Sequence, residues 1–183
     1  MAASTPAFAH LDPVAHGSFA AGFSHPLLGL DHVLAMVAVG LWAAMLGGRA
    51  MWLVPLSFVG TMLVGFLLAM SGAPLPFVEP VILASVVIMG LFVAASRPVS
   101  VWVSAPIVAF FALFHGFAHG GEMGSAGALD YGAGFAAATA ALHIVGIGAA
   151  LIAGRMLRTN STLMWRSSGL VTAAAGLWLA FVG

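Results

Sequence analysis

Apolar residues occur in six long stretches along this chain, and short segments of polar or small residues separate them. Each stretch is close to the roughly 20 residues that an α-helix needs to cross a bilayer. We therefore predict an all-α membrane bundle of six transmembrane helices, with neighbouring helices antiparallel because the connections are short. The expected ranges are 24–46, 51–71, 77–95, 101–120, 132–154 and 163–182. The fifth is rich in glycine and alanine, so we expect it to be the central, most enclosed helix.

The composition supports a membrane protein. Hydrophobic residues make up 62% of the chain and charged residues only 5%, whereas a soluble domain has about 25% charged residues. The chain has no cysteine, which excludes disulfides and thiolate metal sites. Its net charge is zero and it has no lysine, so we expect the lipid bilayer, and not nucleic acid, as its surroundings.

The arginines predict how the bundle is oriented. They lie in or beside the first, third and fifth connections, whereas the second and fourth connections adjoin acidic residues (the arginines are Arg49, Arg97, Arg155, Arg158 and Arg166). The positive-inside rule then places these odd-numbered connections in the cytoplasm and both termini in the periplasm. The expected location is the bacterial inner membrane.

The start of the chain has features of an exported protein. Ala7-Phe8-Ala9 matches the small-x-small pattern before a signal-peptidase cut, although no hydrophobic region precedes it. Residues 1–9 are therefore either a signal-peptide remnant or a chance match. We expect 10–23 to form a periplasmic arm or a surface helix, and 24–183 to form the six-helix domain. His10 and His16 make the arm a candidate metal-capture site, with an accidental pair as the alternative.

The first predicted helix carries an unusual set of polar residues near its start. His25, Asp31 and His32 interrupt an apolar stretch, and ionisable groups at membrane depth are costly and usually functional. Pro26 suits the first turn of a helix, so we expect His25 at the cap. In a continuous helix, His25 and His32 lie about 10.5 Å apart along the axis. This favours two separate levels of ligands, whereas a break at Gly29 would bring the two histidines together.

A second polar motif ends the fourth predicted helix. His115 and His119 are four residues apart on one helical face, where two imidazoles can bind one metal ion. Glu122 follows a Gly-Gly pair that should end the helix. The expected topology brings this helix end and the start of the first helix to the same membrane face, so the two motifs should meet. His143 lies near the middle of the fifth predicted helix, where packing and a metal or proton role both remain open.

Nitrogen and carboxylate ligands without thiolate suit Ni²⁺, Co²⁺, Zn²⁺ or Cu²⁺. The leading hypothesis is a secondary permease, and not an enzyme, that takes up such an ion. The sequence has no phosphate-binding glycine loop, so we do not expect ATP to drive it. One alternative is an intramembrane metal-dependent hydrolase, in which histidines and a carboxylate hold a metal that activates water. Another is a metal-sensing or haem-binding membrane protein.

The two motifs resemble those of the HupE/UreJ family, whose members are nickel or cobalt permeases. The matching residues are His25-Pro26-x-x-Gly29-x-Asp31-His32, continuing into Val39-Gly40-Leu41-Trp42, and Phe114-His115-Gly116-x-Ala118-His119-Gly120-x-Glu122. The plan of six spans is similar too, so the resemblance covers nearly the whole chain. It implies nickel, or else cobalt, as the substrate and hydrogenase or urease maturation proteins as partners. It also implies a metal path formed by His25, Asp31, His32, His115, His119 and Glu122.

Overall fold

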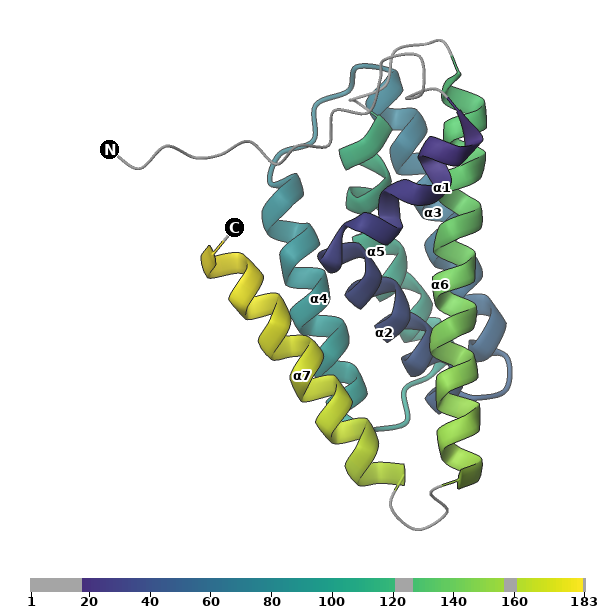
Figure 1. Cartoon of the computed structure of the whole chain (residues 1–183), viewed down its shortest axis with the longest axis vertical. Helices are drawn as coiled ribbons and strands as arrows, with labels where there is room; N and C mark the ends of the chain where they lie inside the picture. Colours follow the sequence, from purple (N-terminus) through teal and green to yellow (C-terminus); the bar gives the residue numbers. More distant parts are fainter. Residues whose placement is uncertain (1–17, 121–126, 157–160, 183) are drawn as a thin grey trace.

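The computed structural model describes residues 18–120, 127–156 and 161–182, and the regular secondary structure in these ranges is entirely α-helical. Seven helices follow one another in these ranges (Figure 1). They are α1 (Phe19–Leu28), α2 (Leu30–Leu46), α3 (Ala50–Met70), α4 (Val78–Ala95), α5 (Val101–Gly120), α6 (Ala128–Met156) and α7 (Ser161–Val182). The all-helical class predicted from the sequence is therefore confirmed for the described residues. The expected signal-peptide remnant and most of the expected arm lie outside them.

The first predicted span, 24–46, is not one helix. Ser18 caps α1 by accepting a hydrogen bond from the Ala21 amide, so α1 begins five residues earlier than the predicted span. His25 consequently lies in the last turn of α1, and the prediction that it caps a helix N-terminus is wrong. At Gly29 the backbone is extended, and α2 leaves at an angle of 86° to α1 (Figure 1). The two helices form an elbow, which we call the α1–α2 elbow.

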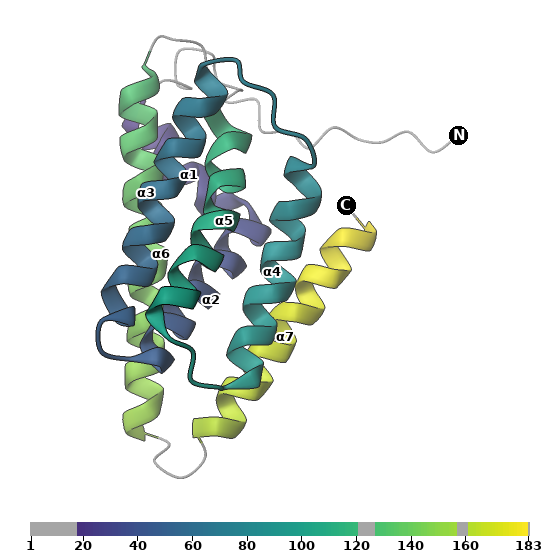
Figure 2. The same cartoon turned by 180° about the vertical axis from the view of Figure 1, so that it is seen from behind.

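The helix at the centre of the bundle is α2. It contacts each of the other six described helices, whereas α6 packs mainly against α1, α2 and α3 (Figures 1 and 2). The prediction that the glycine-rich fifth span is the central helix is therefore wrong, although α6 is the most buried of the four single helices that could each cross a membrane. One flank of α6 exposes large apolar side chains such as Ile144 and Ile152. Glycine content indicates where the backbones of two helices come into contact. It does not indicate how many other helices surround a given helix.

Glycines set the close packing of two helix pairs. A Cβ atom at Gly40 of α2 would overlap the carbonyl oxygen of His143 on α6, and one at Gly146 would overlap that of Val37. On the other side of the bundle, a Cβ at Gly116 of α5 would overlap a carbonyl oxygen of α3. Small residues allow such backbone contact between helices in a membrane. The α2–α6 and α3–α5 pairs are therefore fixed at these crossings.

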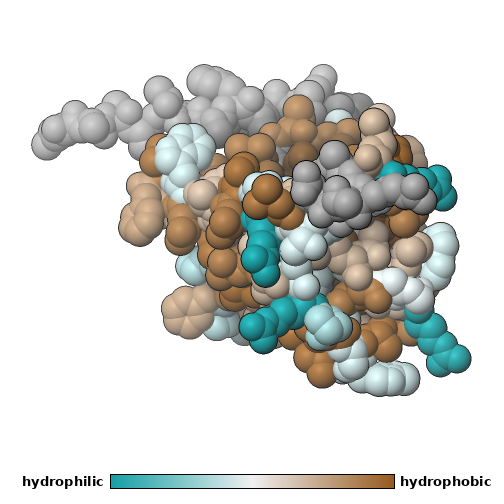
Figure 3. Space-filling model, turned by 90° about the horizontal axis from the view of Figure 1, so that it is seen from below, coloured by the Kyte–Doolittle hydropathy of each residue, from teal (hydrophilic) through white to brown (hydrophobic). Residues whose placement is uncertain are grey.

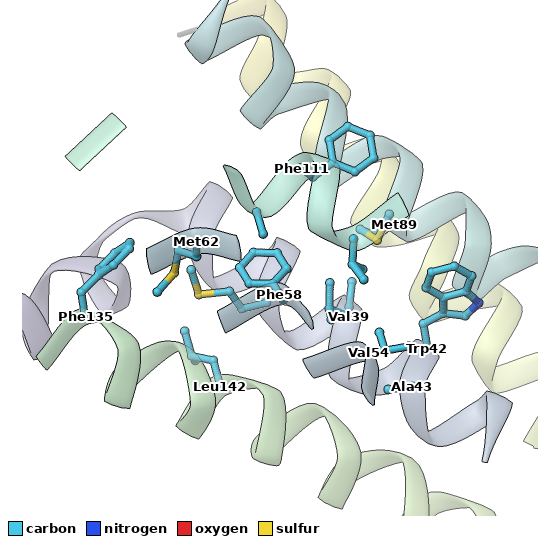
Figure 4. Close-up of a cluster of buried hydrophobic side chains, with 14 of the residues drawn as sticks. Val39, Trp42, Ala43, Val54, Phe58, Met62, Met89, Phe111, Phe135 and Leu142 are labelled. Atoms are coloured by element: carbon cyan, nitrogen blue, oxygen red, sulfur yellow. The ribbon is translucent and has the colours of Figure 1, made fainter. Parts of the chain in front are cut away.

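Large side chains fill the space between these crossings. Figure 4 shows a buried apolar cluster to which α2, α3, α4, α5 and α6 contribute. Trp42, Phe58 and Met62 are each at most 1% exposed. Trp42 also stacks on Phe92 of α4, with ring centroids 4.5 Å apart. On α2 the buried members of this cluster begin at Met36, so the first turn of the helix, with Asp31 and His32, is left to the polar motifs.

The described helices include four that are each long and apolar enough to cross a membrane, namely α3, α4, α5 and α6. The bent pair α1 and α2 passes the same criterion only when it is counted as one span, which gives up to five. The sixth predicted span corresponds to α7, which is not among these candidates. Arg166 and the serines that follow it lower the mean hydropathy of that helix. The structure therefore supports a multi-pass helical membrane protein with four to five candidate spans among the described residues.

Apart from Asp31 at the α1–α2 elbow, charged residues of the described segments lie toward the two ends of the bundle. Arg49 precedes α3, Arg97 follows α4 and Arg155 lies in the last turn of α6, so all three are at one end. Figure 3 views this end and shows hydrophilic side chains among the apolar ones. Glu79 and Asp130 lie in the first turns of α4 and α6, at the opposite end. This is the separation that the alternating arginines predicted.

Candidate metal site

The α1–α2 elbow brings three histidine rings close together. The His25 ring lies 4.3 Å from the His119 ring and 6.4 Å from the His32 ring, centroid to centroid. The two polar motifs therefore meet, as predicted from the topology. The favoured arrangement, in which His25 and His32 occupy two separate levels, is wrong. The bend at Gly29 removes the axial separation that a continuous helix would impose.

Asp31, His32 and His119 form a hydrogen-bonded chain. The Asp31 carboxylate lies 3.0 Å from Nδ1 of His32, and Nε2 of His32 lies 2.7 Å from Nε2 of His119. A carboxylate only accepts, so Nδ1 of His32 donates to it and Nε2 of a neutral His32 carries a lone pair. Nε2 of His119 must then donate to His32. Nδ1 of His119 is left without a hydrogen-bond partner among the described residues.

His115 lies one helical turn from His119 and is completely buried. Its ring is 5.0 Å from the ring of His32, so it adjoins the same chain of groups. Its Nε2 is 2.9 Å from the hydroxyl of Ser85 on α4. Its Nδ1 has no hydrogen-bond partner in the described part of the chain. The four rings of His25, His32, His115 and His119 form what we call the histidine cluster.

Aromatic side chains of α6 enclose the histidine cluster. The Phe135 ring lies 4.9 Å from the His119 ring, and the Tyr131 ring lies 6.1 Å from the His25 ring. Tyr131 in turn stacks on Phe66 of α3. Apolar surroundings of this kind strengthen the electrostatic interactions of the buried histidines. The site is therefore a polar core within an apolar wall.

Several of these side chains were missed in the sequence. Tyr131 is the only tyrosine in the chain, which is a usable signal. Ser85 is a single hydroxyl in an apolar helix and gives no such signal. Phe135 is a large residue in a glycine- and alanine-rich stretch. A single large side chain among small ones indicates a position where the helix packs against a gap, so Phe135 also gives a usable signal.

Glycines of the second motif explain its spacing. His115 and His119 face α2, and the residues that follow them, Gly116 and Gly120, face α3. A Cβ at either glycine would overlap a carbonyl oxygen of α3, from Met62 or Phe66 respectively. The motif thus places ligands on one face of α5 and backbone contact on the neighbouring face.

His143 is separate from the histidine cluster. It is 1% exposed, and neither ring nitrogen has a hydrogen-bond partner within the described ranges. The Phe58 ring lies between the two regions, 5.0 Å from the His143 ring and 5.6 Å from the His115 ring. Along α6, His143 is eight residues beyond Phe135, or about 12 Å. It therefore cannot share an ion with the cluster.

Three candidate ligands lie outside the described residues, namely His10, His16 and Glu122. Within the described ranges, no three histidine, aspartate or glutamate side chains are arranged as they stand to hold one ion. Nε2 of His32 and Nε2 of His119 are too close together to bind one ion as they stand. Two imidazole nitrogens that bind one ion at about 2.0–2.1 Å each lie about 3 Å or more apart, whereas these two nitrogens are 2.7 Å apart. The pair must open before an ion enters between them.

The range of the chain that matches a known protein family includes both motifs. A family model described as "HupE / UreJ protein" matches residues 1–179 of the chain. Protein HupE of Rhizobium leguminosarum bv. viciae is 48% identical over 145 residues, which cover 79% of this chain and 75% of that protein. No solved structure matches the chain.

Proposed function

Since the chain belongs to the HupE/UreJ family, we propose that it is a secondary permease for a divalent transition-metal ion, Ni²⁺ or Co²⁺. The substrate is the ion itself, and the protein moves it across the membrane without changing it. Nitrogen ligands with a carboxylate nearby suit either ion. Hydrogenase or urease maturation proteins, suggested by the family name, would then use the metal after uptake.

One observation carries this proposal, namely the convergence of His25, His32 and His119 at a broken span. Helix breaks in transporters commonly mark the substrate site, because irregular backbone at membrane depth is tolerated only where it lines a cavity or is buried in protein. Here the break also brings a carboxylate, Asp31, next to His32. An apolar bundle bears the cost of burying these groups only where they serve a function.

The close spacing of the histidines suggests how the site replaces the hydration water of an ion. An ion that leaves water loses hydration worth far more than one imidazole returns. Several ligands must therefore replace the water together, and the closely spaced histidines provide them. The Asp31 carboxylate partly balances the charge of the cation. Inward movement of two charges through 100 mV releases roughly 4.6 kcal/mol, so the membrane potential can drive uptake.

The proposed orientation follows the charges. The arginine end of the bundle would face the cytoplasm, and the histidine cluster would lie nearer the periplasmic end of a bacterial inner membrane. With α7 as a sixth span, both termini would be periplasmic. His10, His16 and Glu122 would then extend the path outward from the cluster, and His143 would lie further inward.

Uptake of radioactive nickel into cells or vesicles tests the proposal. We expect His32→Ala and His115→Ala each to reduce accumulation nearly to the level of cells without the protein, because the remaining ligands cannot replace the hydration of the ion. Ser104→Ala is the control. It removes a fully buried hydroxyl whose hydrogen bonds go to the carbonyl oxygens of Val101, the first residue of α5, and of Ser100, which precedes the helix. Accumulation is expressed per unit of membrane-inserted protein, and near-normal values for both histidine variants would overturn the proposal.

A further inference from the structure

Ser85 makes two short polar contacts in the interior of the bundle. It lies on α4 and is 1% exposed. Its Oγ is 2.6 Å from the carbonyl oxygen of Ile82, one turn earlier in the same helix, and 2.9 Å from Nε2 of His115 on α5. The hydroxyl therefore links a backbone carbonyl to a histidine of the cluster.

The number of available hydrogens decides the direction of both hydrogen bonds. A serine hydroxyl has one hydrogen to donate and lone pairs to accept with. The Ile82 carbonyl can only accept, so the hydroxyl hydrogen is donated to it. Oγ then presents a lone pair to His115, and the hydrogen of the second bond must come from Nε2. A neutral imidazole carries hydrogen on one nitrogen only, so Nδ1 of His115 has the free lone pair.

We propose that Ser85 is a positioning residue of the metal path, which holds His115 in the tautomer protonated at Nε2 and leaves Nδ1 to bind the ion. This inference rests on the proposed function. Partners of this kind commonly orient metal-binding histidines and fix their tautomer. Asp31 does the same for His32 from the opposite nitrogen. Two neighbouring histidines of the cluster are thus each held at one nitrogen by a side chain from outside the cluster.

The surroundings of His115 agree with this assignment. Its Nδ1 is buried and has no hydrogen-bond partner among the described residues. A buried acceptor without a partner costs free energy, and a bound ion would supply the missing interaction. If Nδ1 carried the proton, Oγ of Ser85 and Nε2 of His115 would share no hydrogen, because the hydroxyl hydrogen is already donated to Ile82.

The tautomer can be measured directly in the full-length chain. We would label the histidines with ¹⁵N and record magic-angle spinning spectra in lipid vesicles without metal at pH 8, where an ordinary imidazole is neutral. The His115 signals are those that disappear in His115→Asn. We expect His115 to be protonated at Nε2 in the unsubstituted protein. Protonation at Nδ1 would overturn the inference, and this result needs no Ser85 variant to fold.

Nickel titration of the purified protein measures the consequence. Loss of a partner that orients a metal-binding histidine typically weakens affinity about 10–100-fold, which we expect for Ser85→Ala. Ser85→Thr should restore most of the affinity, because a threonine hydroxyl can make the same bond to the preceding turn. Ser104→Ala is the matched control, since this serine is also buried but its hydroxyl hydrogen-bonds to the backbone carbonyls of Ser100 and Val101 and not to a histidine.

These measurements separate the inference from the proposed function. If the unsubstituted protein bound no nickel, the proposed function would fail, whereas the tautomer would still be read from the spectrum. If it bound nickel and folded Ser85→Ala bound with the affinity of Ser104→Ala, the proposed function would stand and the role of Ser85 would be refuted.

Discussion

Replacing Gly29 with alanine tests whether the α1–α2 elbow must leave space for the Asp31–His32 pair. The backbone at Gly29 has φ −86° and ψ 115°, which any residue can adopt. Alanine therefore introduces no backbone strain, and it would restrict the unfolded chain, which typically stabilises a protein by about 0.4–1 kcal/mol. Its Cβ, however, would lie 2.9 Å from Oδ1 of Asp31 and 3.0 Å from Nδ1 of His32.

The size of the effect follows from these distances. Carbon atoms in ordinary contact lie about 3.5 Å or more from their neighbours, so the two atoms must retreat by about 0.5 Å. The side chain of Asp31 is 26% exposed and can move, whereas that of His32 is 7% exposed and is held against His119. A shift of this size disturbs the 3.0 Å contact between Oδ2 of Asp31 and Nδ1 of His32, so the hydrogen bond would weaken. We expect metal affinity to fall about 10–100-fold, or about 1.4–2.7 kcal/mol.

The assay is nickel titration of the purified variant, with thermal unfolding in the same detergent as the measure of folding. Gly60→Ala is the control, because a Cβ at that glycine of α3 would meet nothing within 4 Å. We expect both variants to unfold near the temperature of the unsubstituted protein, and only Gly29→Ala to bind nickel weakly. Equal affinities in the two variants would refute the reasoning that Asp31 controls His32.

Three further expectations concern packing, the inner histidine and topology. Gly116→Ala should lower thermal stability clearly relative to Gly60→Ala, because its Cβ would overlap the backbone of α3 and overpacking typically costs about 1–3 kcal/mol; equal unfolding temperatures would contradict this packing. His143→Ala should change nickel affinity by no more than about twofold relative to the unsubstituted protein, because the Phe58 ring separates His143 from the histidine cluster. A loss of uptake as severe as that of His32→Ala would place His143 on the path itself. Because the chain has no cysteine, thiols introduced at the exposed positions Ser71 and Ser100 should react with an impermeant reagent from opposite sides of the membrane; reaction of both from one side would reject the proposed topology.

The positions of the three helices in the middle of the chain could be predicted closely from the sequence. The predicted ranges 51–71, 77–95 and 101–120 correspond to α3, α4 and α5 with ends that differ by one residue at most. Long apolar runs bounded by glycine, proline or arginine leave little choice for helix position in a membrane. The meeting of the two motifs also follows, because alternate connections must lie on the same side of the bundle.

The α1–α2 elbow does not follow from the sequence in the same way. Residues 24–46 are apolar enough for one continuous span, and a single glycine is tolerated in many helices. What decides the bend is packing between distant residues. A Cβ at Gly22 of α1 would overlap the Tyr131 carbonyl, and one at Gly134 of α6 would overlap that of Phe19, so α1 is fixed on α6 in backbone contact. Similarly, Ser85 gains its role only from a histidine 30 residues away.

The same glycine contacts indicate which side of the histidine cluster moves when the pair of His32 and His119 opens. His119 is on α5. Two glycines that flank His119 in the motif, Gly116 and Gly120, hold α5 in backbone contact with α3. A helix fixed at adjacent turns by backbone contact cannot shift there without separating from its neighbour.

The opposite side of the pair is held less closely. Between the backbone contacts at Gly22 and Gly40 lies the stretch of α1 and α2 that carries His25, Asp31 and His32. That stretch contains the extended backbone at Gly29, where a small change in φ and ψ tilts one helix against the other. We therefore expect the α1–α2 elbow to provide the movement that lets His32 withdraw from His119, while α5 stays in place.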